Sequence, residues 1–222
     1  MNQPKNILYF LLSSIALLLT LNIVTFLNYD IGEFMYKKFN FDRERNVPAI
    51  FSFLLLFTVS GTLLYISFQK LNFKISKIFW ISLSAIFLFL SFDELLVIHE
   101  QVGEITEEHI KGEGVLHYEW LIPYGILLLI FIAVYVKSLI ALPKKVRINT
   151  IISGCLFVGG AVGFEMIGGW YIDNNALITK VEIKRSTGVF IIYSIEETLE
   201  MLGSSYFIYT LFLCLKNHRI SK

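Results

Sequence analysis

Residues 120–142 read WLIPYGILLLIFIAVYVKSLIAL, an almost unbroken apolar run in which Lys137 is the one fully charged side chain. An apolar stretch of about 20 residues is long enough to cross the hydrocarbon core of a bilayer as a helix. Five further runs of this kind occur in the chain. We therefore expect six membrane spans, at about residues 7–28, 48–68, 78–99, 120–142, 148–171 and 189–215.

The composition agrees with this reading. Of the 222 residues, 55% are hydrophobic and 15% aromatic, and the mean hydropathy is +0.66. In lipid, a spanning segment must satisfy its own backbone hydrogen bonds, which favours helices. We expect residues 1–222 to form one all-α, polytopic bundle with no soluble domain. The net charge of +1 and the lack of a basic stripe argue against a nucleic-acid partner.

The connecting segments fall into two sets by charge. Two short connections, 69–77 and 143–147, and both termini carry Lys and Arg but no Asp or Glu. The longer connections, at about 29–46, 100–119 and 172–188, mix basic residues with many acids. Because Lys and Arg near the span ends mark the cytoplasmic side, we expect both termini in the cytoplasm, with the protein in a cell membrane of bacterial type.

Carboxylates recur inside the apolar runs. The third, fifth and sixth spans contain six of them: Asp93, Glu94, Glu165, Glu196, Glu197 and Glu200. In the expected topology all lie roughly 9–18 Å below the outer interface, at about 1.5 Å per helical residue. An ionised group at such depth costs several kcal/mol, so these residues normally face a protein interior or a water-filled cavity and mark function. The sequence predicts one outward-facing site built by three helices.

The end of the third span adds an imidazole to the acids. On a continuous helix, Asp93, Glu100 and Glu104 fall within about 40° of one another, with His99 beside Glu100 and Glu94 beside Asp93. Carboxylates with imidazole suit Zn, Mn or Fe, whereas carboxylates with water suit Ca or Mg. The alternative for His99 and Glu100 is that they are interfacial residues that end the span.

The sixth span carries the densest group. Glu196 and Glu200 are one turn apart, and like charges at this spacing repel, more strongly in a low dielectric. Either one of them is protonated or a cation lies between them. Glu197 points about 100° away from this pair.

These considerations give two sets of candidate residues and three classes of function. The candidate ligands for a divalent metal cation are Asp93, His99, Glu100, Glu165, Glu196 and Glu200. Glu94 and Glu197 are the candidate general acid or base. The first class is a metal-dependent membrane hydrolase or transferase acting on a membrane lipid or a lipid-linked small molecule. The second is a cation or proton transporter, and the third is a structural or sensory protein. The inner halves of the spans lack acids, which favours the first class over transport.

The Glu196-Glu197 pair resembles the Glu-Glu-x-x-x-Arg motif of CAAX-type intramembrane proteases, and the run up to Glu200 is similar to a motif of undecaprenyl-pyrophosphate phosphatases. Met201 stands at the Arg position of the first motif, and the further motifs of both families have no counterpart in this chain. Each overlap covers about six residues, so neither family contributes residues to the expected site.

Two structural expectations complete the sequence analysis. Gly159 and Gly163 form a small-x-x-x-small pair, which predicts close approach of a neighbouring helix. The segment from Tyr29 to Asn46 mixes aromatic and charged residues, which indicates an amphipathic segment in the membrane interface.

Overall fold

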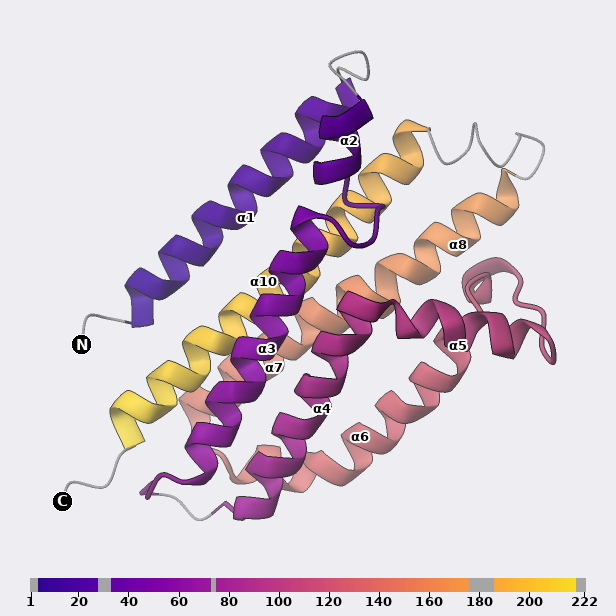
Figure 1. Ribbon diagram of the computed structural model, residues 1–222. Coiled ribbons are helices and arrows are strands. Elements are labelled where there is room, and N and C mark those ends of the chain that lie inside the picture. The colour runs from indigo at the N-terminus through magenta and orange to yellow at the C-terminus, as the bar shows by residue number, and fades with distance from the viewer. Residues whose placement is uncertain (1–3, 28–32, 73–74, 176–185, 219–222) are drawn as a thin grey trace.

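The computed structural model describes residues 4–27, 33–72, 75–175 and 186–218, and the chain in these ranges is helical between short connections (Figure 1). The helices are α1 (Pro4–Leu27), α2 (Glu33–Phe39), α3 (Val47–Ser67), α4 (Lys77–Leu96), α5 (Ile98–Glu107), α6 (Leu121–Ala141), α7 (Lys144–Val158), α8 (Glu165–Asn174) and α10 (Thr187–His218). A 3₁₀ turn, Gly114–Leu116, precedes α6, and a π-helix, Gly159–Phe164, joins α7 to α8.

Within the described residues, six helical segments are long and apolar enough to cross a membrane. They coincide with the six expected spans, and the prediction of an all-α fold with six spanning helices is confirmed. The fifth span is longer than expected, because α7, the π-helix and α8 run on as Lys144–Asn174. The third is shorter, because α4 ends at Leu96 rather than at residue 99.

Helix α10 is the centre of the bundle. It packs against α1, α3, α7, the π-helix and α8, while α4 packs mainly on α3 (Figure 1). Helix α6 lies at the edge, and none of the most apolar part of it is buried. Because α10 contacts five other helical segments, side chains in its first half can lie close to side chains from several helices.

The two ends of the bundle differ in charge. At the basic end, α1, α4 and α7 begin and α10 ends; at the acid-rich end, α4 and α8 finish and α10 begins (Figure 1). Lys77, Lys144, Lys145 and Arg147 belong to the basic end. We use these two names below.

Close approach of the fifth span to α10 depends on different glycines from those expected. A Cβ on Gly160 would lie 2.6 Å from the backbone oxygen of Glu196, and one on Gly203 would lie 2.6 Å from the backbone nitrogen of Phe157. Gly159 and Gly163 have open space beside them, so the expectation for that pair is wrong. The π-helix holds more residues per turn than an α-helix, and this shift in register turns Gly160 toward α10.

An asparagine within the first span ties the beginning of the chain to its end. Asn22 is fully buried, and its Nδ2 donates to Ser194 Oγ on α10 at 2.8 Å. Its Oδ1 accepts the backbone N–H of Phe41 at 3.1 Å. A buried amide requires such partners, so Asn22 fixes both α10 and the connection between α2 and α3.

The connection between α2 and α3, residues 40–46, is anchored by buried Asn40, Phe41 and Asn46, while residues 42–45 are exposed. Asn40 donates to the hydroxyl of Tyr193 at 2.7 Å, and Asn46 donates to the Asn40 carbonyl at 2.6 Å. Of the segment expected to lie in the interface, residues 33–39 form α2, and residues 29–32 lie outside the described part. The asparagine loop, as we call residues 40–46, therefore has a defined position against α10.

Candidate functional site

Five glutamates form a cluster in the half of the bundle near the acid-rich end. The glutamate cluster consists of side chains that are each partly exposed although their helices are packed together: Glu94, Glu165, Glu196, Glu197 and Glu200. Three come from α10, one from α4 and one from α8. The electrostatic interactions among these carboxyl groups show that the side chains lie near one another.

Within the cluster, Glu165 and Glu196 are near enough for their carboxyl groups to interact directly. Two ionised carboxylates repel each other, so a hydrogen bond between them would require a proton on one of the two. Gly160 allows the helices to approach here: a Cβ there would lie 2.9 Å from Glu200 Cγ, so only glycine lets α10 come this close to the fifth span. The pair lies at the junction of the π-helix and α8.

Glu94 brings the third span into the cluster. It interacts electrostatically with both Glu197 and Glu200. Among the described residues, the glutamate cluster forms no ion pair with Lys or Arg. The structure thus brings together five of the eight residues that the sequence indicated, as a group of carboxyls without a basic partner among the described residues.

Glu44, which lies in the asparagine loop, was not predicted from the sequence to belong to the site. Glu44 interacts electrostatically with Glu94, Glu197 and Glu200. Although the side chain is exposed, the surrounding protein reduces its solvation and raises its pKa; Glu100, Asp42 and Glu165 add to the rise, and His99 opposes it. A carboxylate in a charged, loop-like segment gives no sequence signal, because its place depends on the buried asparagines.

Asp93 has a different role from its neighbour Glu94. Its Oδ1 accepts the backbone N–H of His99 at 2.7 Å and the hydroxyl of Tyr124 at 3.1 Å. Asp93 therefore caps the beginning of α5, since Val97, which precedes that helix, has no side-chain acceptor. This carboxylate is buried and already engaged.

The continuous stripe of Asp93, Glu100 and Glu104 expected on one helix is wrong. Val97 adopts a left-handed conformation (φ 59°, ψ 47°), which ends α4 and starts α5 in a new direction (Figure 1). A β-branched residue rarely adopts such angles; the cap from Asp93 supports the break. Glu100 and Glu104 are exposed on α5, which is a separate helix from the one that carries Asp93.

His99 lies between Asp93 and Trp120. Its Nδ1 is 3.5 Å from Asp93 Oδ1, and its ring meets the indole edge to face at a centroid distance of 5.3 Å. Burial lowers the pKa of His99, but the hydrogen bond and charge of Asp93, with Glu44 and Glu94, outweigh it and leave the pKa raised. The imidazolium form is thus favoured next to the acids.

Trp120 connects this group to the glutamate cluster. Its Nε1 donates to Glu165 Oε1 at 3.3 Å, and its ring contacts Tyr124. Gly103 of α5 lies beside it, since a Cβ added at Gly103 would be 3.5 Å from the Cβ of Trp120. The sequence analysis had assigned no role to Trp120, which stands at the start of a span where a belt aromatic is common.

A second acid–imidazole pair lies outside the cluster. Asp173 Oδ1 is 2.6 Å from His117 Nδ1, and Asp173 Oδ2 accepts the backbone N–H of Gly114. Gly169 lets the His117 backbone approach, since a Cβ there would lie 2.7 Å from His117 Cβ. This pair fixes the 3₁₀ turn to α8.

In the ranges that the structure describes, no three His, Cys, Asp or Glu side chains are arranged ready to hold a metal ion. The donor set around the Glu165–Glu196 pair is entirely carboxylate oxygen, which is the chemistry preferred by Mg²⁺ and Ca²⁺. His99 is engaged with Asp93 and Trp120 rather than with this pair.

Six spanning helices around a group of intramembrane glutamates define a multi-pass α-helical membrane protein. The chain belongs to the family described as a domain of unknown function, DUF8692, which matches residues 10–215. No curated protein and no solved structure is significantly similar to it.

Proposed function

We propose that this membrane protein binds a divalent cation at the glutamate cluster and is a metal-dependent hydrolase or transferase of lipids or lipid-linked molecules. The observation that carries the proposal is the convergence of five glutamates from three helices without a Lys or Arg partner among the described residues.

Charge balance supports cation binding. An uncompensated ionised group buried in a bundle costs several kcal/mol. Five carboxyl groups in one place must therefore hold protons, a cation, or both. A hydrogen bond between Glu165 and Glu196 would be the protonated arrangement, and a cation that displaces this proton would occupy the same place.

The acids of the glutamate cluster would have different roles according to their positions. Glu165, Glu196 and Glu200 would hold the cation, because they meet at the contact between Gly160 and α10. When bound, the cation would polarise a phosphoryl or ester oxygen. Glu94 and Glu197 would act as general acid or base. Asp93 and His99, which the sequence suggested as ligands, are instead engaged with each other, with Tyr124 and with Trp120, and Glu100 is exposed on α5.

A one-sided site favours an enzyme over a transporter. The half of the bundle near the basic end is filled by apolar side chains, with Val59, Leu63 and Leu211 at no more than 1% exposure. Ser60 and Ser84 bond to each other there. No described acid or histidine continues the site through this half. We place the acid-rich end outside the cell, because the Lys-rich connections lie at the other end.

Cation binding can be measured directly. We expect the purified protein in lipid nanodiscs to bind Mg²⁺, Ca²⁺ or Mn²⁺ in calorimetry with release of a proton. Glu196→Gln should weaken binding at least about tenfold, since a direct charged ligand is lost. Glu107→Gln is the matched control, because Glu107 is an exposed acid on α5 outside the cluster. A folded wild-type protein that binds none of these cations would contradict the proposal.

Two further assays separate the classes of function. An enzyme should convert components of a total membrane lipid extract in a cation-dependent way, detected by mass spectrometry, and Glu197→Gln should abolish this turnover. The same protein in proteoliposomes should carry no Mg²⁺, Ca²⁺ or Mn²⁺ across the bilayer. If the wild-type protein does carry cations and Glu196→Gln abolishes this flux, the protein is a transporter and the proposal of an enzyme is wrong.

A further inference from the structure

Residues 114–120, which lead from the 3₁₀ turn into α6, run along α8 in the opposite direction to that helix. Asp173, near the end of α8, holds the 3₁₀ turn through its carboxylate. Glu165, the first residue of α8, accepts from Nε1 of Trp120 at 3.3 Å. Eight positions separate the two acids, which is about 12 Å of helix at 1.5 Å per residue. We call residues 114–120 the strap.

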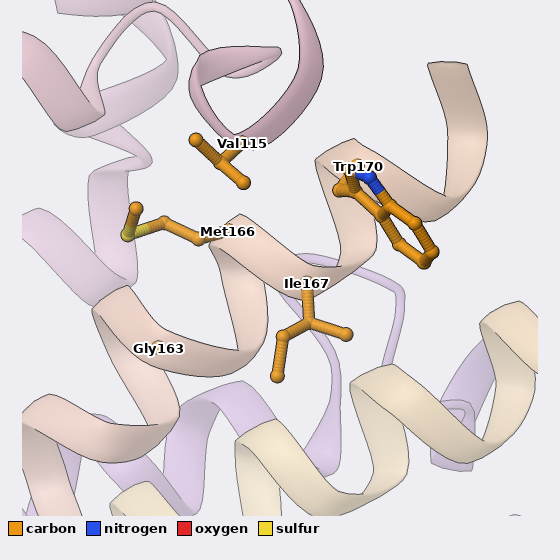
Figure 2. A pocket seen from close by; sticks show the side chains of 5 residues that line it. All are labelled: Val115, Gly163, Met166, Ile167 and Trp170. Atoms are coloured by element: carbon orange, nitrogen blue, oxygen red, sulfur yellow. The ribbon is translucent and has the colours of Figure 1, made fainter. Parts of the chain in front are cut away.

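The middle of the strap also lies on α8. Gly169, halfway between the two acids, lets it approach, since a Cβ there would lie 2.7 Å from His117 Cβ. Figure 2 shows Val115, on the 3₁₀ turn, above the helix that carries Met166 and Ile167. The strap therefore meets α8 near its end, at its middle and at its beginning, in one antiparallel register.

The indole of Trp120 is held on several sides where it reaches Glu165. The ring centroids of His99 and Tyr124 are each 5.3 Å from that of Trp120, and a Cβ at Gly103 would lie 3.5 Å from Trp120 Cβ. The Trp120 carbonyl accepts the backbone N–H of Tyr124 at 3.1 Å, which continues the strap into α6. Because an indole has a single N–H donor, a ring fixed in this way donates in one direction, toward Oε1 of Glu165.

This contact gives the Glu165 carboxyl group a defined position. A long, flexible side chain loses rotamer freedom when it binds a ligand. A hydrogen bond that already orients the carboxyl group removes part of that cost, and the loss of such an outer partner typically weakens metal binding by about 10–100-fold. Tyr118 of the strap interacts electrostatically with Glu165 and Glu196, so the strap lies beside the glutamate cluster.

We propose that the strap positions Glu165 for the glutamate cluster, with Trp120 as the positioning residue and Asp173 as the anchor at the other end. For the ligand that Glu165 would take, the inference rests on the proposed function. It adds to that function two residues, Trp120 and Asp173, that act through Glu165 and contact no cation themselves.

Calorimetry with Mg²⁺, Ca²⁺ or Mn²⁺ tests the effect of the strap on affinity. Trp120→Phe keeps an aromatic ring and removes the donor, so it should weaken cation binding about tenfold. Trp170→Phe is the matched control, because Trp170 is the same residue type on α8 and is 51% exposed. It should leave the affinity unchanged. An affinity that Trp120→Phe does not change in a folded protein would overturn the inference.

A double-mutant cycle tests whether the two ends of the strap act as one unit. Asp173→Ala releases the anchor and should weaken cation binding, whereas Asn174→Ala, which loses only a bond within its own helix, should not. The double variant Asp173→Ala, Trp120→Phe should bind no more weakly than Trp120→Phe alone, because both changes act through the same hydrogen bond. Losses that simply add would overturn the inference.

The contact itself can be observed without a cation, by NMR of ¹⁵N-labelled tryptophan indoles in nanodiscs. The chain contains three tryptophans, and the signal lost in Trp120→Phe identifies Trp120. Glu165→Gln and Asp173→Ala should each move the Trp120 N–H signal, since one changes its acceptor and the other releases the strap. The signal of Trp80, which is buried on α4, should stay in place. A Trp120 signal that either substitution leaves unmoved would overturn the inference.

The two proposals fail separately. If the wild-type protein binds no cation, the proposed function is refuted, and the indole signals alone decide whether the strap holds Glu165. If the cation binds and Trp120→Phe leaves the affinity unchanged, the positioning role is refuted alone.

Discussion

At the residue scale, Asp93 shows how an intramembrane acid can be structural. Its carboxylate accepts from the backbone of His99 and from Tyr124, and so it holds the turn at which α4 becomes α5. Glu94, the next residue, points to a different environment and joins the cluster. Two adjacent acids in one apolar run thus serve different purposes, and their order in the sequence does not reveal which is which.

Removal of the Asp93 cap should destabilise the fold. We expect Asp93→Ala to lower the free energy of unfolding by about 2–3 kcal/mol, since hydrogen bonds to a charged acceptor are lost. Asp93→Asn keeps an acceptor oxygen and should cost about 1 kcal/mol. Thermal unfolding in detergent micelles measures both. Equal stability of the Ala and Asn variants would show that the cap is unimportant.

Because the pKa of His99 is raised in the folded protein, the free energy of unfolding should decrease as the pH rises. Its folded pKa lies above the unfolded value of about 6.5, so its stabilising contribution is complete below that pH. The contribution is lost as the pH rises through the folded pKa. We expect the melting temperature of wild type to fall over this interval more than that of His99→Gln, which does not titrate. Parallel curves for the two proteins would contradict the assignment.

The sequence was informative about acids in apolar runs and uninformative about their partners. Glu165, Glu196 and Glu200 could be found because lipid makes any carboxylate conspicuous. Trp120 and Glu44 could not, since a tryptophan at a span end and an acid in a charged connection are both ordinary. The amide of Asn22, within the first span, was a signal of the same kind as the acids and could have been used.

At the element scale, the π-helix decides how the fifth span meets α10. Its extra residue turns Gly160 to the contact and places Glu165 immediately after it. Such local widening often occurs at functional sites. The cluster of glycines in this span indicated packing, but the side of the helix that packs depends on a hydrogen-bond pattern that no spacing rule encodes.

Two neighbouring glycines test this register. Gly160→Ala places a Cβ 2.6 Å from a backbone oxygen of α10 and should destabilise the protein by about 1–3 kcal/mol. Gly159→Ala meets open space and should be neutral or stabilising by up to about 1 kcal/mol. Unfolding in a denaturant series compares the two. The opposite order would mean that α10 packs on the other face.

The break between α4 and α5 was also beyond the sequence. Helix propensity gives no reason to stop at Val97, and a β-branched residue is a poor choice for a left-handed conformation. The break is stabilised because the Asp93 carboxylate accepts the backbone N–H of His99 and because the His99 ring packs against Trp120. Both are tertiary effects.

At the scale of the whole molecule, the number and approximate positions of the spans followed from hydropathy, because the thickness of a bilayer fixes the length of an apolar helix. The arrangement of the spans did not follow. That α10 is central and α6 peripheral depends on which faces fit together, and the apolar faces of all six look alike in sequence.

The membrane orientation can be tested with single cysteines in a Cys155→Ser, Cys214→Ala background. Glu113→Cys, exposed before the 3₁₀ turn, should react with an impermeant maleimide on intact cells. Lys145→Cys, exposed at the basic end, should react only after permeabilisation. The reverse pattern would place the glutamate cluster on the cytoplasmic side.

The bonds of Asn22 to Ser194 and of Asn40 to Tyr193 join residues 172 and 153 positions apart. During synthesis, Asn22 and Asn40 cannot form these hydrogen bonds until α10 has been made, because Ser194 and Tyr193 lie on that helix. Before then, the asparagine loop, which carries Glu44, lacks its contact with α10. A nascent chain halted before α10 would therefore have five spans but would lack Glu196, Glu197 and Glu200, so the glutamate cluster can form only when the last helix inserts.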